Sequence, residues 1–331
     1  MNTAVIMVQH GDFPFEFKEK HKEMFTFVKQ MLEKISQKTR KIARDSDDPY
    51  SVDMQKIKDS IQKCGHFKHL EVGYMEFSSP SIAEAVEKIA RKGIEEIVLV
   101  NSPGIFMRSS HSLIDIPNII KKIQSNHPDL ELIYAPPGGF LEEMADVMVK
   151  RIDNILDKPG VECLIDDVPS SKDYGVVLVA HGDVPLDYLE KRDMNMAEEH
   201  IEKWSDMVRD WPRDEKNDPL LHDTCILENY IRDKGGYSNF EIGNLEFSVP
   251  TLEDALKKVL NRGAEKIIFM GGTGFMDRSS HSLVDIPEAI GKLQNKYPSV
   301  ELSYKEPDID FVSLDLAKII VTKVENALKN K

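Results

Sequence analysis

The run Ala4-Val-Ile-Met-Val-Gln-His10-Gly11-Asp12 returns 171 residues later as Gly175-Val-Val-Leu-Val-Ala-His181-Gly182-Asp183. Each stretch is an apolar run that ends in His-Gly, a pattern typical of a buried strand followed by a turn. An internal repeat is sought before any other feature because it decides the domain organisation. The recurrence of this strand indicates that the chain contains one domain twice.

Two further blocks repeat at almost the same offset, 170 residues. Glu76-Phe-Ser-Ser-Pro80 matches Glu246-Phe-Ser-Val-Pro250. Gly104-Ile-Phe-Met-Arg108-Ser-Ser-His111-Ser-Leu-Ile-Asp115-Ile-Pro117 matches Gly274-Phe-Met-Asp-Arg278-Ser-Ser-His281-Ser-Leu-Val-Asp285-Ile-Pro287. The total length of 331 residues also suits two domains that each bury a core. We therefore expect one copy over 1–157, a linker over 158–173 and a second copy over 174–331.

Strands and helices are expected to alternate within each copy. In the first copy, strands are predicted over 4–8, 70–75, 96–100 and 130–134, and helices over 16–44, 52–64 and 141–156. Ser81 to Glu84 and Thr251 to Asp254 have the pattern of a helix-capping box, and Asp115 is placed to cap a helix beginning near Pro117. The alternation predicts an α/β fold: two tandem copies of a small flavodoxin- or Rossmann-like domain, each with four parallel strands.

The composition excludes several classes of protein. Acidic residues outnumber basic ones by 57 to 43, so the net charge of −14 argues against a general nucleic-acid-binding or anionic-membrane-binding surface. The apolar opening run has no cationic leader and reads as a strand rather than a signal peptide. Cys64, Cys163 and Cys225 form neither a CxxC pair nor a disulfide framework. We expect a cytoplasmic protein that binds neither membranes nor nucleic acid.

The repeated polar residues fall where the strands end. His10 follows the first strand, Glu76 the second, and His111 lies in the loop after the strand over 96–100. In a parallel sheet these loops meet at one edge, where such folds bind ligands. We therefore predict two equivalent sets of catalytic residues, and we predict the four histidines as metal ligands; the sets are His10, Glu76 and His111, and His181, Glu246 and His281.

The ligand types narrow the choice of metal. Imidazole pairs with a carboxylate suit Co(II), Fe(II) or Ni(II), whereas Mg(II) and Ca(II) prefer oxygen ligands throughout. The chain lacks HExxH, which argues against a standing zinc site. It also lacks GxGxxG, the P-loop motif and GxSxG, so no nucleotide cofactor is expected.

A comparison of the two copies distinguishes residues that are retained for the fold from residues that are retained for function. The loop over 101–117 keeps ten of 17 residues in the second copy, whereas the helical segment over 82–99 keeps five of 18. Turning the chain explains the retained Gly104, Asp115 and Pro117, but it does not explain the persistence of Arg108-Ser109-Ser110-His111. Single histidines that do not recur, such as His66 and His222, are more often structural or surface residues.

These motifs resemble the sirohydrochlorin chelatases of the CbiX type. A strand ending in His-Gly, a Glu-Phe-x-x-Pro block and a His followed four residues later by Asp-Ile-Pro occur in both halves. The resemblance implies a class II tetrapyrrole chelatase in the fused, two-domain form, which inserts a divalent metal into a macrocycle without ATP. It further implies that the histidine pairs handle the metal. Fused relatives often keep the pair in one half only, so the number of working sites stays open.

The resemblance carries expectations for substrate and partners. The substrate would be sirohydrochlorin or a similar tetrapyrrole, with cobalt favoured as the metal and iron or nickel as alternatives. A carboxylate-rich macrocycle would need donors on this acidic protein, and by position these are Arg108, Ser109, Ser110, Arg278, Ser279 and Ser280. A packing role for the arginines is the alternative. The competing function is a non-catalytic carrier of metal or tetrapyrrole. Because fusion supplies the pseudo-twofold contact, we expect a monomer.

Overall fold

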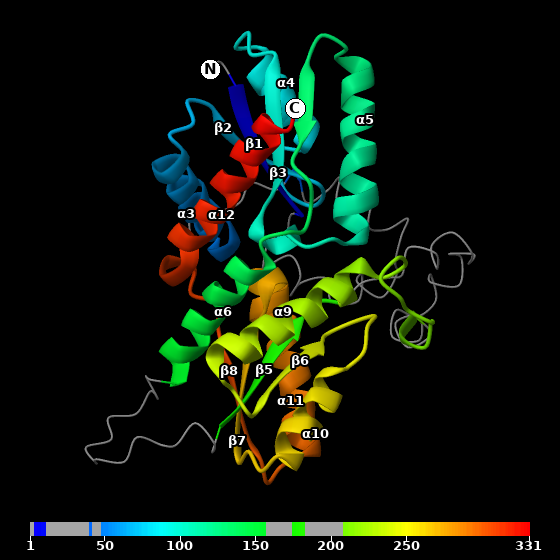
Figure 1. Ribbon diagram of the computed structural model, residues 1–331, viewed down its shortest axis with the longest axis vertical. Coiled ribbons are helices and arrows are strands. Elements are labelled where there is room, and N and C mark those ends of the chain that lie inside the picture. The colour runs from blue at the N-terminus through cyan, green and yellow to red at the C-terminus, as the bar shows by residue number, and fades with distance from the viewer. Residues whose placement is uncertain (1–2, 11–39, 42–47, 157–173, 183–207) are drawn as a thin grey trace.

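In a computed structural model of the chain, two four-stranded parallel sheets lie end to end (Figure 1). The structure describes residues 3–10, 40–41, 48–156, 174–182 and 208–331. The predicted helix over 16–44 and the predicted linker over 158–173 lie outside these residues, apart from 40–41.

The described elements of the first half alternate as predicted, and they are β1 (Thr3–Gln9), α3 (Pro49–Gly65), β2 (Leu70–Tyr74), α4 (Ile82–Ala90), β3 (Glu96–Asn101), α5 (Ile116–Asn126), β4 (Glu131–Tyr134) and α6 (Leu141–Leu156). The second half repeats this order with β5 (Tyr174–Ala180), α9 (Pro219–Gly235), β6 (Phe240–Asn244), α10 (Leu252–Asn261), β7 (Lys266–Gly271), α11 (Ile286–Lys296), β8 (Glu301–Lys305) and α12 (Ile309–Lys329).

The strand order makes each half a doubly wound sheet. It runs β2-β1-β3-β4 in the first half and β6-β5-β7-β8 in the second, with every pair parallel. The chain moves outward from β1 to β2 on one side and then returns to place β3 on the other side of β1. Ligand sites of such sheets lie where the winding reverses, here beyond the carboxyl ends of β1 and β3. The predicted α/β fold class is confirmed.

Helices cover both faces of each sheet. In the first half one face of the sheet packs against α4 and α5 around residues such as Ile6, Val86 and Ile116, all fully or almost fully buried. The corresponding face of the second half packs against α10 and α11. Helices α4 and α10 begin at Ser81 and Thr251 with the complete capping boxes that the sequence predicts. The amphipathic helices therefore lie where their apolar faces are needed.

The last helix of each half packs on the other half. Helix α12, at the end of the chain, lies along α3 and contacts β3 of the first sheet, while α6 of the first half lies along α9 of the second (Figure 1). As a result one apolar cluster runs through both halves and includes Met7, Met148, Leu178 and Leu316. The predicted copies are therefore sequence repeats that exchange a helix in space, and no cut between 157 and 174 separates two closed cores.

Among the described residues, no helix combines the length and the apolar character needed to cross a membrane.

Candidate active site

His10 and His111 meet at the point where the winding of the first sheet reverses. His10 directly follows β1, and His111 opens a single π-helical turn (His111–Asp115) in the connection after β3. Their ring centroids lie 4.8 Å apart, with the ring planes at 64°. Neighbouring parallel strands thus bring together two imidazoles that are about a hundred residues apart in sequence.

The second half repeats this arrangement. His181 follows β5 and His281 opens the equivalent π-helical turn (His281–Asp285). The ring centroids are 5.2 Å apart and the planes are close to perpendicular, at 86°. About a third of the His111 and His281 side chains is exposed, 35% and 34%. Two independent copies therefore reach the same histidine geometry, and π-helical turns of this kind recur at functional sites.

Each π-helical turn also brings an aspartate beside its histidine. Asp115 Oδ2 forms a hydrogen bond of 2.8 Å with Nδ1 of His111. Asp285 Oδ2 comes within 2.7 Å of Nδ1 of His281, but this approach does not have the geometry of a hydrogen bond. The hydrogen bond to Asp115 keeps the proton on Nδ1 of His111 and leaves Nε2 as the nitrogen with the lone pair. The prediction that Asp115 caps a helix is wrong, because neither Asp115 nor Asp285 makes a side-chain cap bond. The π-helical turn moves the aspartate back toward its histidine.

A different contact orients His181. Its Nδ1 lies 2.8 Å from the carbonyl oxygen of Gly182, and a carbonyl only accepts, so Nδ1 carries the proton. Gly182 has φ of +84°, and a Cβ there would stand 1.9 Å from the carbonyl oxygen of Glu246. The glycine is therefore needed for the close approach of the glutamate block.

The two glutamates stand beside their histidines through the backbone. The N–H of Glu76 donates to the carbonyl of His10 at 2.9 Å, and Glu246 repeats this contact with His181. The residue after each glutamate, Phe77 or Phe247, has φ of +54° or +56°. Non-glycine residues rarely adopt this left-handed conformation outside sites where the surroundings impose it. The strained loop holds the phenylalanine ring against the histidine, 5.9 Å between the centroids of Phe77 and His10.

An arginine braces each glutamate loop, and neither arginine is predicted from the sequence. Arg40 donates from Nη1 to the carbonyl of Ser78 at 2.9 Å and also bonds the carbonyl of Met75. Arg213, which is not aligned with Arg40 by the repeat, bonds the carbonyl of Phe247 and the hydroxyl of Ser248. The two arginines occupy different positions in the repeat, so a comparison of the two copies does not reveal either of them as a repeated residue.

The geometry describes histidine pairs rather than three-ligand sites. Within the described part of the chain, no group of three or more histidine, cysteine, aspartate or glutamate side chains is arranged to hold a metal ion. The glutamates therefore lie next to the imidazole pairs without completing a ligand set in this conformation. Two imidazoles bind a divalent ion more loosely than a closed tetrahedral site does, which suits an ion that must leave.

The residues predicted to bind the substrate make hydrogen bonds and ion pairs with other residues of the protein. Ser109, Ser110, Ser279 and Ser280 are between 3% and 8% exposed, and Ser109 exchanges hydrogen bonds with Ser112 inside its own loop. Arg108 and Arg278 lie between the two halves, where each binds a buried aspartate of the other half. Hydrogen bonds to these aspartates raise the pKa of both guanidinium groups. Their binding of macrocycle carboxylates stays a prediction.

The loops that carry the two histidine pairs contact each other between the two halves. The loops after β3 and β7 touch, with Thr273 Oγ1 3.1 Å from Met107 Sδ. Nε2 of Gln9 donates to Oδ2 of Asp277 at 3.5 Å. Gln9 directly precedes His10, and Asp277 lies four residues before His281. The carboxyl ends of both sheets accordingly point toward the middle of the molecule (Figure 1).

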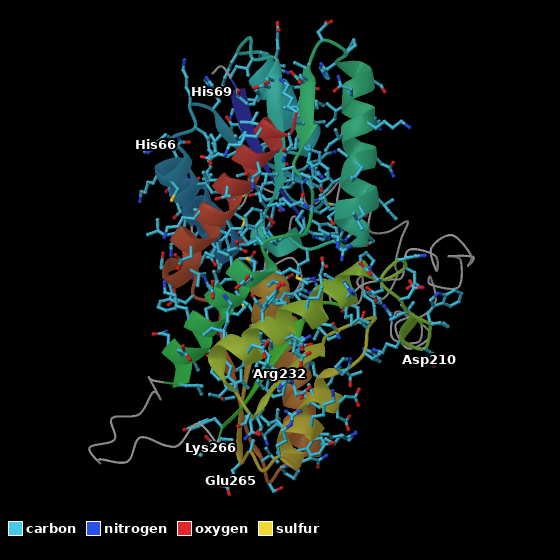
Figure 2. All side chains as sticks on the ribbon, viewed as in Figure 1. His66, His69, Asp210, Arg232, Glu265 and Lys266 are labelled. Carbon is cyan, nitrogen blue, oxygen red and sulfur yellow. The ribbon has the colours of Figure 1, made fainter. Side chains whose placement is uncertain are left out.

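Other features lie apart from the histidine pairs. Figure 2 shows His66 and His69 at the outer edge of the first half, near the α3–β2 connection, where the expectation of structural or surface histidines places them. Two open hollows of about 420 and 430 Å³ are lined by α5 with β4 and by α6 with α12. Neither hollow is lined by a predicted site residue.

The residues that follow His10 and Gly182 in sequence lie outside the described ranges.

Fold and histidine geometry define a duplicated α/β protein with an imidazole pair at the reversal point of each sheet. The family model CbiX matches residues 42–155 and 222–308, more than half of the chain. The chain therefore belongs to the CbiX family of class II chelatases.

Named relatives and a solved structure are consistent with this assignment. A sirohydrochlorin cobaltochelatase of Saccharolobus islandicus (strain L.S.2.15 / Lassen #1) is 35% identical over 99 residues, which cover 28% of this chain and 76% of the relative. A sirohydrochlorin ferrochelatase of Priestia megaterium is 30% identical over 125 residues, 38% of this chain and 41% of the relative. The crystal structure of the sirohydrochlorin chelatase SirB from Bacillus subtilis subspecies spizizenii in complex with cobalt has a TM-score of 0.56 at 14% identity. The match covers 100% of this chain and 97% of that one, and at this identity it shows the shared fold.

Proposed function

We propose that this protein inserts a divalent metal ion, with cobalt favoured, into sirohydrochlorin or a related tetrapyrrole without ATP. One observation carries the proposal: in each half two imidazoles from adjacent strands stand 4.8 or 5.2 Å apart, centroid to centroid. Membership of the CbiX family supports the reaction class, and the names of the relatives support the substrate.

The reaction needs a metal donor and a proton acceptor at the same place. The macrocycle releases two pyrrole N–H protons as the ion enters, and the ion exchanges its water or protein ligands for four ring nitrogens. A neutral imidazole does either task near pH 7, because its lone pair binds the metal or takes up a proton. With Nδ1 of His111 held by Asp115, Nε2 of His111 is the nitrogen assigned to these tasks in the first half.

The remaining predicted residues take supporting roles. Glu76 and Glu246 adjoin the pairs and serve as additional bases for the second pyrrole proton. The arginines and serines before His111 and His281 stay predicted contacts for the carboxylates of the macrocycle. In this structure the arginines bind aspartates of the other half and the serines are buried.

Cobalt is favoured by the relatives rather than by the ligands. The relative matched over 76% of its length is named a cobaltochelatase, whereas the one named a ferrochelatase is matched over 41%. Imidazole ligation by itself does not separate Co(II) from Fe(II) or Ni(II). Nickel and iron therefore remain arms of the test.

The proposal is tested by mixing purified protein with sirohydrochlorin and Co(II), Fe(II) or Ni(II) and following the change in visible absorbance. We expect metalation faster than the spontaneous reaction and many product molecules per protein. No acceleration with any metal contradicts the proposal. Tight binding of metal or macrocycle with at most one product per protein would instead identify a carrier.

The division of work between the halves is tested with two double variants. His10→Ala with His111→Ala removes the first pair, and His181→Ala with His281→Ala removes the second. Because both pairs share one geometry, we expect each double variant to lose about half of the activity and the quadruple variant to lose nearly all. If one double variant kept full activity, the pair that it lacks would be idle.

A further inference from the structure

Two buried aspartates hold the histidine loops of the opposite halves. Asp223, on α9 of the second half, is 2% exposed and binds Arg108 of the first half. Asp53, on α3 of the first half, is 0% exposed and binds Arg278 of the second half. The two contacts are related by the internal repeat, so each half receives one clamp from the other.

Each carboxylate makes several contacts with its arginine. Asp223 accepts from Nη2 of Arg108 at 2.6 Å and from Nε at 3.1 Å, and its Oδ2 also accepts from the backbone N–H of Arg108 at 3.1 Å. Asp53 makes the same contacts with Arg278, at 2.6, 3.1 and 2.8 Å. A carboxylate bound to both side chain and main chain fixes the backbone position of that residue and not only its charge.

The clamped residue belongs to the same rigid turn as the distal histidine. Arg108 precedes His111 by three residues, and Ser112 Oγ ties the turn by donating toward the carbonyls of Met107 and Ser109, at 3.0 and 3.2 Å. In the second half Ser282 closes the turn onto the carbonyls of Asp277 and Ser279, at 2.7 and 3.0 Å. A displacement of Arg108 or Arg278 is therefore passed on to the imidazole at the end of the same turn.

We infer that Asp223 and Asp53 are positioning residues that set the distal histidine of the opposite half, so that each histidine pair depends on a side chain of both halves. The inference rests on the proposed function for its activity readout. It goes beyond that function in stating that neither site is built by one half alone.

The test crosses each aspartate with each histidine pair. Asp223→Asn and Asp53→Asn are introduced into the two double-alanine variants described above, so that one pair works at a time. With the first pair working, Asp223→Asn should lower kcat/KM about tenfold or more, since a shift near 1 Å at a reacting group costs up to about 100-fold. Asp53→Asn should change the same variant less than about twofold. With the second pair working, the pattern should reverse.

A second readout is independent of activity. In full-length protein with ¹⁵N-labelled histidine, the ring signals of His111 and His281 are assigned by their loss in His111→Gln and His281→Gln. Asp223→Asn should shift the His111 signals and leave those of His281, and Asp53→Asn should do the reverse. Asp146→Asn is the matched control, because Asp146 also pairs across the halves, with Lys234 at 2.5 Å, but on the exposed surface.

The outcomes separate this inference from the proposed function. Equal losses for both aspartate variants with either pair, or no loss with either, overturn the inference, because general destabilisation or a purely structural contact would act on both pairs alike. If the native protein metalates no tetrapyrrole, the proposed function fails, and the crossed or uncrossed pattern of the histidine signals still decides the inference.

Discussion

The carboxylate of Asp115 is the smallest feature that the site depends on. It forms a hydrogen bond of 2.8 Å with Nδ1 of His111, whereas Asp285 comes within 2.7 Å of Nδ1 of His281 without hydrogen-bond geometry. Removing the charge while keeping the shape, as in Asp115→Asn, frees the imidazole to take the other tautomer. Loss of such a supporting contact commonly costs about 10- to 100-fold in metal affinity or activity. We therefore expect the Co(II) insertion rate of the His181→Ala, His281→Ala variant to fall by about tenfold or more when Asp115→Asn is added.

The measurement is the initial rate of metalation against Co(II) concentration. Asp285→Asn in the same background is the control, because it adjoins the pair that has been removed. If Asp115→Asn left the rate and the Co(II) dependence unchanged, the aspartate would have no part in orienting His111.

Individual residues were predictable from the sequence only where the repeat marked them. The histidines stood out because they recur at strand ends. Asp53 and Asp223 also occupy equivalent positions, so comparing the copies carried a signal for them, but they lie in helices without a motif. Their partners lie in the opposite half, and no local pattern states which half a helix packs against.

At the scale of elements, the exchanged helices each place a cation inside the other half. Lys323 of α12 is 4% exposed and donates to the carbonyls of Pro136 and Gly138 in the first half, at 2.7 and 2.6 Å. Its ammonium also lies 4.5 Å from the centroid of the Phe106 ring. Arg151 of α6 is 5% exposed and donates to the carbonyl of Gly271 in the second half. Carbonyl dipoles and rings thus replace the water that burial removes.

Burial of Lys323 makes the stability of the protein depend on pH. It lowers the pKa of the ammonium from 10.5 to about 8. Between these values the unfolded chain holds the proton and the folded chain does not, so stability rises with pH across this window. Compared with a Lys323→Met variant, the free energy of unfolding of the native protein should increase by up to about 3 kcal/mol from pH 8 to pH 10.5.

Urea unfolding of both proteins at several pH values across this window measures the difference. Lys329→Met, an exposed lysine on the same helix, is the control and should give a curve parallel to that of the native protein. A difference between native protein and Lys323→Met that stays constant with pH would show that the lysine is not buried as the structure has it.

Most elements could be predicted, because their signals are local. The apolar strands, the capping boxes at Ser81 and Thr251, and helix α6 over Leu141–Leu156 follow from periodicity and capping chemistry. The π-helical turn at His111 could not be predicted, since Asp-Ile-Pro reads equally well as an ordinary helix start. An amphipathic pattern predicts that a helix buries one face, but it does not identify the sheet that covers it.

At the scale of the whole molecule, the exchange of α6 and α12 joins the halves more closely than a linker would. A single apolar cluster includes residues of both sheets and both exchanged helices. Each half by itself would therefore expose the faces of α3 or α9 that a helix of the other half now covers. Apolar area left in water costs about 25 cal/mol per Å². An isolated half is therefore expected to associate with another chain that covers this area.

A chain cut within 158–173 tests this dependence. We expect fragments 1–165 and 166–331, produced together, to purify as a one-to-one complex, since each completes the core of the other. Produced alone, either fragment should pair with a second copy of itself or precipitate, because the repeat gives every fragment one helix that suits the exchanged position. Light scattering after size-exclusion chromatography measures the mass, with the intact chain as reference. A fragment that stayed monomeric and melted near the temperature of the intact chain would contradict the exchange, and with it the assignment of each histidine loop to a clamp from the opposite half.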